Sequence, residues 1–142
     1  MGADDLKYPA LGKFPDGSLK VIPTAAYLTL NTAVGLREGY FTDLEIVDSR
    51  GKWFIVRAAR KLHGEGRFGG YNLFLNQRIR VELDLHDEDR NSDVEQIRAL
   101  ILGDFESWLG WRSREDYTSL REAIISAPTI TDLLGRLAAA VT

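Results

Sequence analysis

The chain has 142 residues, of which 44% are hydrophobic and 27% are charged, and its formal net charge at pH 7 is -3. This size and mixture predict one domain spanning residues 1–142 and exclude a disordered tail, a collagen-like fibre and a multidomain enzyme. The chain has no cysteine, which excludes disulfide scaffolds, thiolate metal sites and a cysteine nucleophile. The apolar runs are too short to span a membrane, and acids precede the first of them, unlike in a signal peptide. We therefore expect a cytoplasmic protein with no membrane partner.

The charges fall in two adjacent blocks of opposite sign. Residues 50–80 carry eight lysines or arginines against one acid, whereas residues 82–106 carry nine acids against two arginines. Such asymmetry can mark a basic binding face, but neighbouring blocks of opposite sign can also neutralise each other within one fold. The pattern alone does not choose between the two.

The N-terminal third has mixed signals. Residues 1–18 contain prolines and glycines at positions 9, 12, 15 and 17, which predict a loosely structured lead-in that ends in a turn over 14–18. A short strand is expected over 19–22. Residues 23–38 are ambiguous: Tyr27, Leu30 and Val34 have helical spacing, yet alternate residues from Leu28 onward are apolar as in a strand. The spacing favours a helix, without excluding the strand.

Alternation predicts three further strands, over 41–47, 53–62 and part of 71–86, with a hairpin turn at 48–51. Pairing Ile46 with Phe54 aligns the first two strands and places Asp43 opposite Arg57. Pairing Leu62 with Tyr71 places Phe54 opposite Ile79 and Trp53 opposite Arg80. Both registers agree on the buried side. The predicted core comprises Phe54, Val56, Ile79, Val81 and Leu83, and the predicted outward row comprises Trp53, Arg57 and Lys61.

The last third is predicted to be helical. Asp93 or Ser92 can cap a helix whose apolar stripe comprises Ile97, Ile101, Phe105, Trp108 and Leu109. A second helix is expected from a capping box at 113–116 to Pro128, and a third begins after Thr129 or Thr131. The fold class is therefore α+β: an antiparallel sheet of β-hairpins over 19–86, followed by about three helices over 92–142 packed on one face.

Motifs for nucleotides and metals are weak. The G-x-G-x-x-G match at 64–69 precedes a predicted strand, whereas a dinucleotide site needs a helix there, so it predicts a hairpin loop. The acidic run 84–95 lacks the glycine of a calcium loop in either register. Glu82, Asp84 and His86 share an outward row and form a weak candidate metal site. We expect no metal and no cofactor.

The first functional hypothesis is a protein-interaction domain of the immunity or adaptor type, without catalytic activity, whose partner is another protein or a second copy of the chain. The second is a nucleic-acid binder with a basic and aromatic sheet face. An enzyme acting on a small molecule comes third, because no nucleophile motif is present. The candidate residues of the basic face are Trp53, Arg57, Lys61, Arg67, Phe68, Phe74, Arg78 and Arg80.

Overall fold

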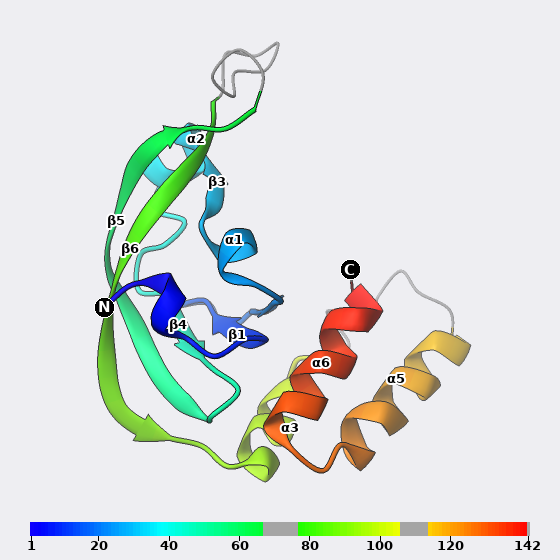
Figure 1. The fold of residues 1–142 in the computed structure, drawn as a ribbon. Helices are drawn as coiled ribbons and strands as arrows, with labels where there is room; N and C mark the ends of the chain where they lie inside the picture. The colour runs from blue at the N-terminus through cyan, green and yellow to red at the C-terminus, as the bar shows by residue number, and fades with distance from the viewer. Residues whose placement is uncertain (67–76, 106–113, 142) are drawn as a thin grey trace.

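The computed structural model of the protein describes residues 1–66, 77–105 and 114–141 (Figure 1). Its elements in chain order are η1 (Ala3–Asp5), β1 (Ala10–Lys13), β2 (Leu19–Ile22), α1 (Ala25–Leu28), β3 (Leu30–Thr32), α2 (Ala33–Arg37), β4 (Glu45–Val47), β5 (Lys52–Gly64), β6 (Arg78–Asn91), α3 (Val94–Gly103), α5 (Arg114–Ser126) and α6 (Ile130–Val141). An antiparallel sheet precedes the C-terminal helices, which confirms the α+β class. Within the described ranges, no helix is both long and apolar enough to cross a membrane.

The six strands form one curled sheet in the order β2-β1-β4-β5-β6-β3. Strands β5 and β6 make a long hairpin, and every pairing between neighbouring strands is antiparallel. Strands β2 and β3 are the two edges of the sheet, although only α1 separates them along the chain. Helix α1 packs against both edge strands and so bridges the opening of the curled sheet (Figure 1).

One face of the sheet, which we call the inner face, holds the first of two hydrophobic clusters. The residues predicted as core, Phe54, Val56, Ile79, Val81 and Leu83, are all buried in this cluster, which confirms the prediction. Further members come from the segments that cover this face, namely Ala3, Leu6, Leu28, Phe41 and Leu44. The inner face is thus closed by η1, α1 and the loop before β4.

The opposite, outer face is covered by the C-terminal helices where β1, β2, β4 and β5 meet. Leu11, Val21, Val47 and Trp53 are buried there with Ile97, Ile101, Phe105, Leu120, Ile124, Leu133, Leu134 and Leu137. Trp53 is only 1% exposed, so its predicted outward, solvent-facing position is wrong. The alternation placed it on the right face, but the helices bury that face at this point. Trp108 and Leu109 lie outside the described residues.

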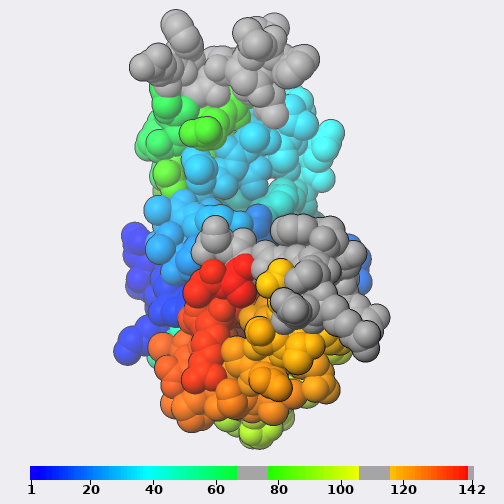
Figure 2. Space-filling model, turned by 90° about the vertical axis from the view of Figure 1, so that its right-hand side faces the viewer, coloured from blue at the N-terminus to red at the C-terminus, as the bar shows by residue number. Residues whose placement is uncertain are grey.

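The helix boundaries follow local capping chemistry. Asp93 caps α3 by accepting from the backbone N–H of Gln96, whose side chain accepts in return from the backbone of Asp93. Thr129 caps α6 by accepting from the backbone N–H of Asp132. Each cap is one of the two alternatives that the sequence left open. Helices α5 and α6 then lie side by side, as Figure 2 shows.

The register of the long hairpin differs from the prediction. Ile46 does face Phe54, as expected, but Phe54 faces Asp87 and not Ile79, which faces Gly64. Arg80 likewise faces His63 and not Trp53. The cause is the length of β6, which continues to Asn91 through the acidic residues that were expected to form a loop.

Irregularities in the β5–β6 pairing invert the alternation of β5. The register shifts between Val56 and Ala58, and again between Lys61 and His63. Lys61 consequently faces Val81 on the inner side of the sheet, although it remains exposed at the end of the hairpin. Arg60 takes the outer position opposite Glu82. The predicted outward row of Trp53, Arg57 and Lys61 is therefore not continuous, because a bulge shifts every later residue to the other face.

Three expectations for the N-terminal half also need correction. The lead-in 1–18 contributes η1 and β1, and β1 lies inside the sheet between β2 and β4. The ambiguous segment 23–38 contains both alternatives, because α1, β3 and α2 follow one another in short pieces. The pairing of Asp43 with Arg57 does not form, since Asp43 has a φ of 55° and β4 begins only at Glu45.

Candidate binding site between the edge strands

A half-enclosed pocket of about 250 Å³ lies at the opening of the curled sheet, between the edge strands β2 and β3. Ligand sites are common at such mouths of curled sheets, where walls of several elements converge. The lining residues come from β1, β2, α1, β3 and the loop before β4: Gly12, Phe14, Lys20, Ile22, Tyr27, Leu28, Leu30, Asn31, Tyr40 and Leu44. Most of these side chains are apolar.

Gly12 lines this pocket from the inner face of the sheet. Gly12 pairs with Lys20 of β2 on one side and with Ile46 of β4 on the other, and it contributes no side chain between them. A methyl group at this position would lie 3.2 Å from Cδ1 of Ile22 and 3.4 Å from Cδ1 of Leu44. A side chain at residue 12 would therefore crowd Ile22 and Leu44, two other residues of the lining.

Among the described residues that line this pocket, Lys20 alone carries a charge. Its Nζ donates to the phenol oxygen of Tyr40 at 2.9 Å, and it lies 5.0 Å from the ring centre of Tyr27. Burial lowers the pKa of Lys20, but the hydrogen bond and electrostatic attraction of Tyr40, together with Tyr27, outweigh burial and raise it above its ordinary value. The ammonium therefore stays protonated among apolar walls.

The loop before β4 positions Tyr40. The backbone N–H of Tyr40 donates to the carbonyl oxygen of Gly35, and Gly39 turns the chain with a φ of 83°. The ring of Tyr40 then packs edge-on against Phe14, with 5.4 Å between the ring centres. Because Thr32 caps α2 by accepting from the backbone N–H of Gly35, the position of Tyr40 depends on that cap.

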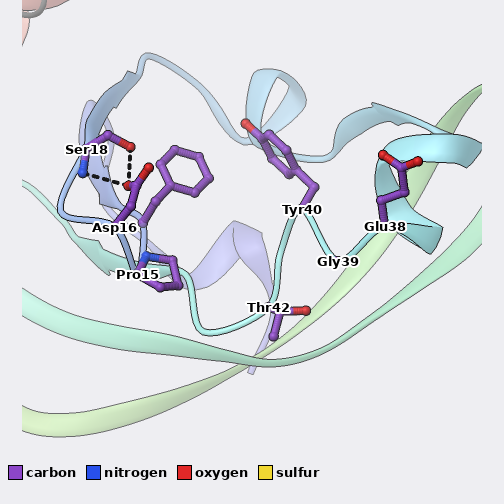
Figure 3. Close-up of a pocket in the computed structure, with 9 residues that line it drawn as sticks. Pro15, Asp16, Ser18, Glu38, Gly39, Tyr40 and Thr42 are labelled. Carbon is purple, nitrogen blue, oxygen red and sulfur yellow. Dashed lines mark hydrogen bonds between the residues drawn. The ribbon is translucent and has the colours of Figure 1, made fainter.

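A second, open pocket of about 650 Å³ adjoins the first and shares Phe14 and Tyr40 with it. Figure 3 shows Asp16 at one end of this pocket, Glu38 at the other and Tyr40 between them. Ser18 donates to Oδ1 of Asp16 from its hydroxyl at 2.6 Å and from its backbone N–H at 2.9 Å, and these bonds lower the pKa of Asp16. The open pocket is thus acidic at its rim, while the enclosed pocket holds a cation.

The mouth of the enclosed pocket carries two exposed apolar side chains. Tyr27 is 43% exposed and Leu30 is 37% exposed, and both line the pocket. In Figure 2 the segment from α1 to α2, coloured light blue to cyan, lies on the surface above α5 and α6. The pocket therefore opens on an accessible part of the molecule.

The described candidates of the predicted basic face, Trp53, Arg57, Lys61, Arg78 and Arg80, do not form one continuous exposed row. Arg80 is directed to Glu65 at 3.2 Å and to the carbonyl oxygen of Ala26 at 2.6 Å. Lys61 donates to Gln77 on the other side of the sheet. Arg57 and Arg78 are exposed, whereas Trp53 is buried. The remaining candidates, Arg67, Phe68 and Phe74, lie outside the described residues.

The row of Glu82, Asp84 and His86 does lie exposed along one side of β6, as the alternation predicted. Glu82 forms an ion pair with Arg60 at 2.8 Å, and Asp84 lies 3.6 Å from the N-terminal amino group. The described part of the chain contains no group of three or more histidine, cysteine, aspartate or glutamate side chains placed to hold a metal ion.

The sequence did not single out Lys20, Tyr27 or Tyr40. Alternation over 19–22 does place Lys20 and Ile22 on one face, but Leu19 and Val21 on the other face are equally apolar. Both faces of this sheet are buried, so the alternation carried no sign that Lys20 points inward.

No protein-family model matches this chain, and no curated protein or solved structure is significantly similar to it.

Proposed function

We propose that the chain is a protein-binding domain of the immunity or adaptor type, with no reaction of its own, which acts in the cytoplasm. A segment of the partner protein docks in the opening between β2 and β3. The observation that carries this proposal is the half-buried ammonium of Lys20 inside a mostly apolar pocket, with Tyr27 and Leu30 exposed at its mouth. Exposed apolar side chains around a pocket are typical of interfaces that bury an anchoring residue.

The shape of the site favours a protein segment over a small molecule. A small ligand is usually buried over most of its surface. Here the enclosed pocket of about 250 Å³ continues into the open pocket of about 650 Å³, and Phe14 and Tyr40 line both. An extended segment can place one residue in the enclosed pocket and cross the open one with the residues next to it.

Nucleic-acid binding has less support. The strands from the basic and the acidic block pair with each other, and Arg60 forms an ion pair with Glu82 across the hairpin. Arg80 is engaged by Glu65 and by α1. The basic block therefore gives no continuous track of phosphate contacts along the described strands.

An enzyme has less support as well. A lysine nucleophile or base needs a lowered pKa, whereas the pKa of Lys20 is raised. The lining of the enclosed pocket includes no carboxylate, imidazole or aliphatic hydroxyl group that could act as a general base beside it.

Selection from two phage-displayed libraries of random peptides, one with free N-termini and one with free C-termini, tests the proposal. We expect peptides that bind the native chain and the control Ile125→Ser, since Ile125 is an exposed apolar residue on α5. The same peptides should bind Tyr27→Ala and Leu30→Ser at least tenfold more weakly, because each removes part of the mouth. A selection without enriched peptides, or peptides that bind both mouth variants at full strength, would contradict the proposal.

A further inference from the structure

We infer that the docking segment is a C-terminus: its last residue places an apolar side chain in the enclosed pocket and its terminal carboxylate on Lys20 and Tyr40. This inference rests on the proposed function and adds the chemistry of the partner. It follows from the polar groups of the pocket, from the size of the pocket and from the charge of its surroundings.

The two polar groups are matched to a carboxylate. Lys20 Nζ has three N–H donors: one bonds to the phenol oxygen of Tyr40, 2.9 Å away, a second interacts with Tyr27, and one is left for a ligand. The hydroxyl of Tyr40 accepts that bond and keeps its own hydrogen for another acceptor. The ammonium and the phenol can therefore each donate to one oxygen of the same carboxylate. Charge-assisted bonds of this kind are stronger than neutral ones, and more so among apolar walls.

The pocket suits a carboxylate better than a phosphate. Phosphate sites usually combine several cations, a fork of arginine donors or a row of backbone N–H groups. Lys20 is the only cation among the lining residues, and the remaining walls are mostly apolar side chains such as Ile22, Leu28 and Leu44. One ammonium balances a single negative charge.

The enclosed pocket has room for about one residue, and that residue must present an apolar group and a carboxylate together. A C-terminal residue carries both on the same Cα. An internal aspartate or glutamate places its carboxylate on the side chain itself, so the apolar group must come from a neighbour that points elsewhere. The half-enclosed shape favours the C-terminus of the partner, because a chain that ends in the pocket needs no exit on its far side.

The open pocket adds a preference for the residues that precede the terminus. Asp16 and Glu38 lie at its rim, and Asp16 holds its negative charge through two bonds from Ser18. A segment that ends on Lys20 and crosses this pocket meets negative charge behind its carboxylate. We therefore expect a lysine or arginine shortly before the C-terminal apolar residue.

Three small probes separate the possible sources of the carboxylate. N-acetylphenylalanine mimics a C-terminal residue, N-acetylphenylalaninamide lacks the carboxylate, and N-acetylglutamic acid α-amide carries it only on the side chain. Each is titrated into the native chain while the backbone amide resonances of Tyr27, Leu30 and Tyr40 are followed by NMR. We expect the first probe to bind about tenfold more tightly than either of the others, as a charge-assisted pair predicts.

Substitutions assign that preference to the pocket. Lys20→Met, which keeps the length of the side chain, should abolish it, and Tyr40→Phe should weaken it. Lys52→Met, at an exposed position of β5, should leave it intact. Two results would overturn the inference: equal affinity for the acid and its amide, or a preference that survives in Lys20→Met. Tighter binding of the glutamate probe would overturn the assignment to a C-terminus. Each of these leaves the proposed function standing, since peptide selection with the mouth variants decides that separately.

Discussion

The indole nitrogen of Trp53 donates a hydrogen bond to the hydroxyl oxygen of Ser92, 2.8 Å away. This bond joins β5 to the residue that precedes the cap of α3, and it satisfies the one polar atom of a side chain that is 1% exposed. The guanidinium of Arg90 lies over the same ring at 4.1 Å from its centre. Through these contacts Trp53 connects the sheet to the helical layer.

Replacing Trp53 by alanine should lower the free energy of unfolding by about 3 to 5 kcal/mol, because it removes a large buried ring. Ser92→Ala should cost about 1 to 3 kcal/mol, since it leaves the indole N–H without its partner in a buried setting. Equilibrium unfolding in urea measures both. Leu62→Ala is the control, because Leu62 is 50% exposed and should change little. A Trp53→Ala effect as small as that of the control would show that the ring is not part of the core.

Asp48 should be a second position of large effect. Its side chain is fully buried and accepts from the backbone N–H groups of Lys7 and Arg50 and from the Arg50 guanidinium, at 3.2, 2.9 and 2.6 Å. Asp48→Ala leaves these donors unpaired and should cost about 3 kcal/mol. The exposed pair of Arg60 and Glu82 offers a matched control, and Glu82→Ala should cost less than about 1 kcal/mol. Equal losses would contradict the account of the Asp48 turn.

The stability of the chain should also report on Glu88. Burial, and then the neighbouring Glu45, raise the pKa of Glu88 above its ordinary value of 4.5, and Oε2 of Glu88 is buried without a hydrogen-bond partner among the described residues. The folded chain therefore holds this proton more tightly than the unfolded chain. The stability that protonated Glu88 contributes to the folded chain is fully present below about pH 4.5. It is lost as the pH rises through the folded pKa of Glu88.

Glu88→Gln should therefore be more stable than the native chain at pH 7, and the difference should shrink as the pH falls through the folded pKa of Glu88 and be lost below about 4.5. Thermal unfolding at a series of pH values measures it. Glu122→Gln, at an exposed position of α5, should show no such trend. A native chain more stable than Glu88→Gln at pH 7 would reverse the sign and refute the argument.

Much of the fold could be predicted because the alternation of apolar and polar residues along the strands shows which side chains lie on the inner face. Phe54 and Val56 lie in the regular stretch between two register shifts, so their burial follows from parity. Trp53 shows the limit, since alternation assigns a residue to a face but does not say whether helices distant in sequence cover it. Lys61 shows a second limit of the prediction. A bulge after Val56 moves Lys61 from the outer to the inner side of the sheet, and no clear feature of the sequence marks that bulge.

The site could not be predicted for a different physical reason. Gly12, Lys20 and Tyr40 meet only because the sheet curls and α1 bridges its two edges. Glycine in the predicted lead-in was attributed to loose structure, whereas Gly12 lies in β1, pairs with Lys20 and lines the pocket. Such a role depends on the neighbours across the sheet, and a single sequence does not name those neighbours.

Labelled single-stranded RNA should not bind saturably to the native chain at low salt, because the cations of the hairpin are interleaved with carboxylates and the net charge is -3. Fluorescence anisotropy measures this. Micromolar affinity that falls with salt at a slope of about -0.7 per neutralised phosphate would instead favour nucleic-acid binding.

The location of a bound peptide tests the central claim most directly. A peptide obtained by selection on the native chain is isotopically labelled, and intermolecular NOEs to the protein side chains are recorded. The account predicts NOEs to Tyr27, Leu30 and Tyr40, and none to Ile125 on α5. NOEs confined to the helical layer or to the outer side of the β5–β6 hairpin would contradict it, because they would place the interface away from the opening between β2 and β3.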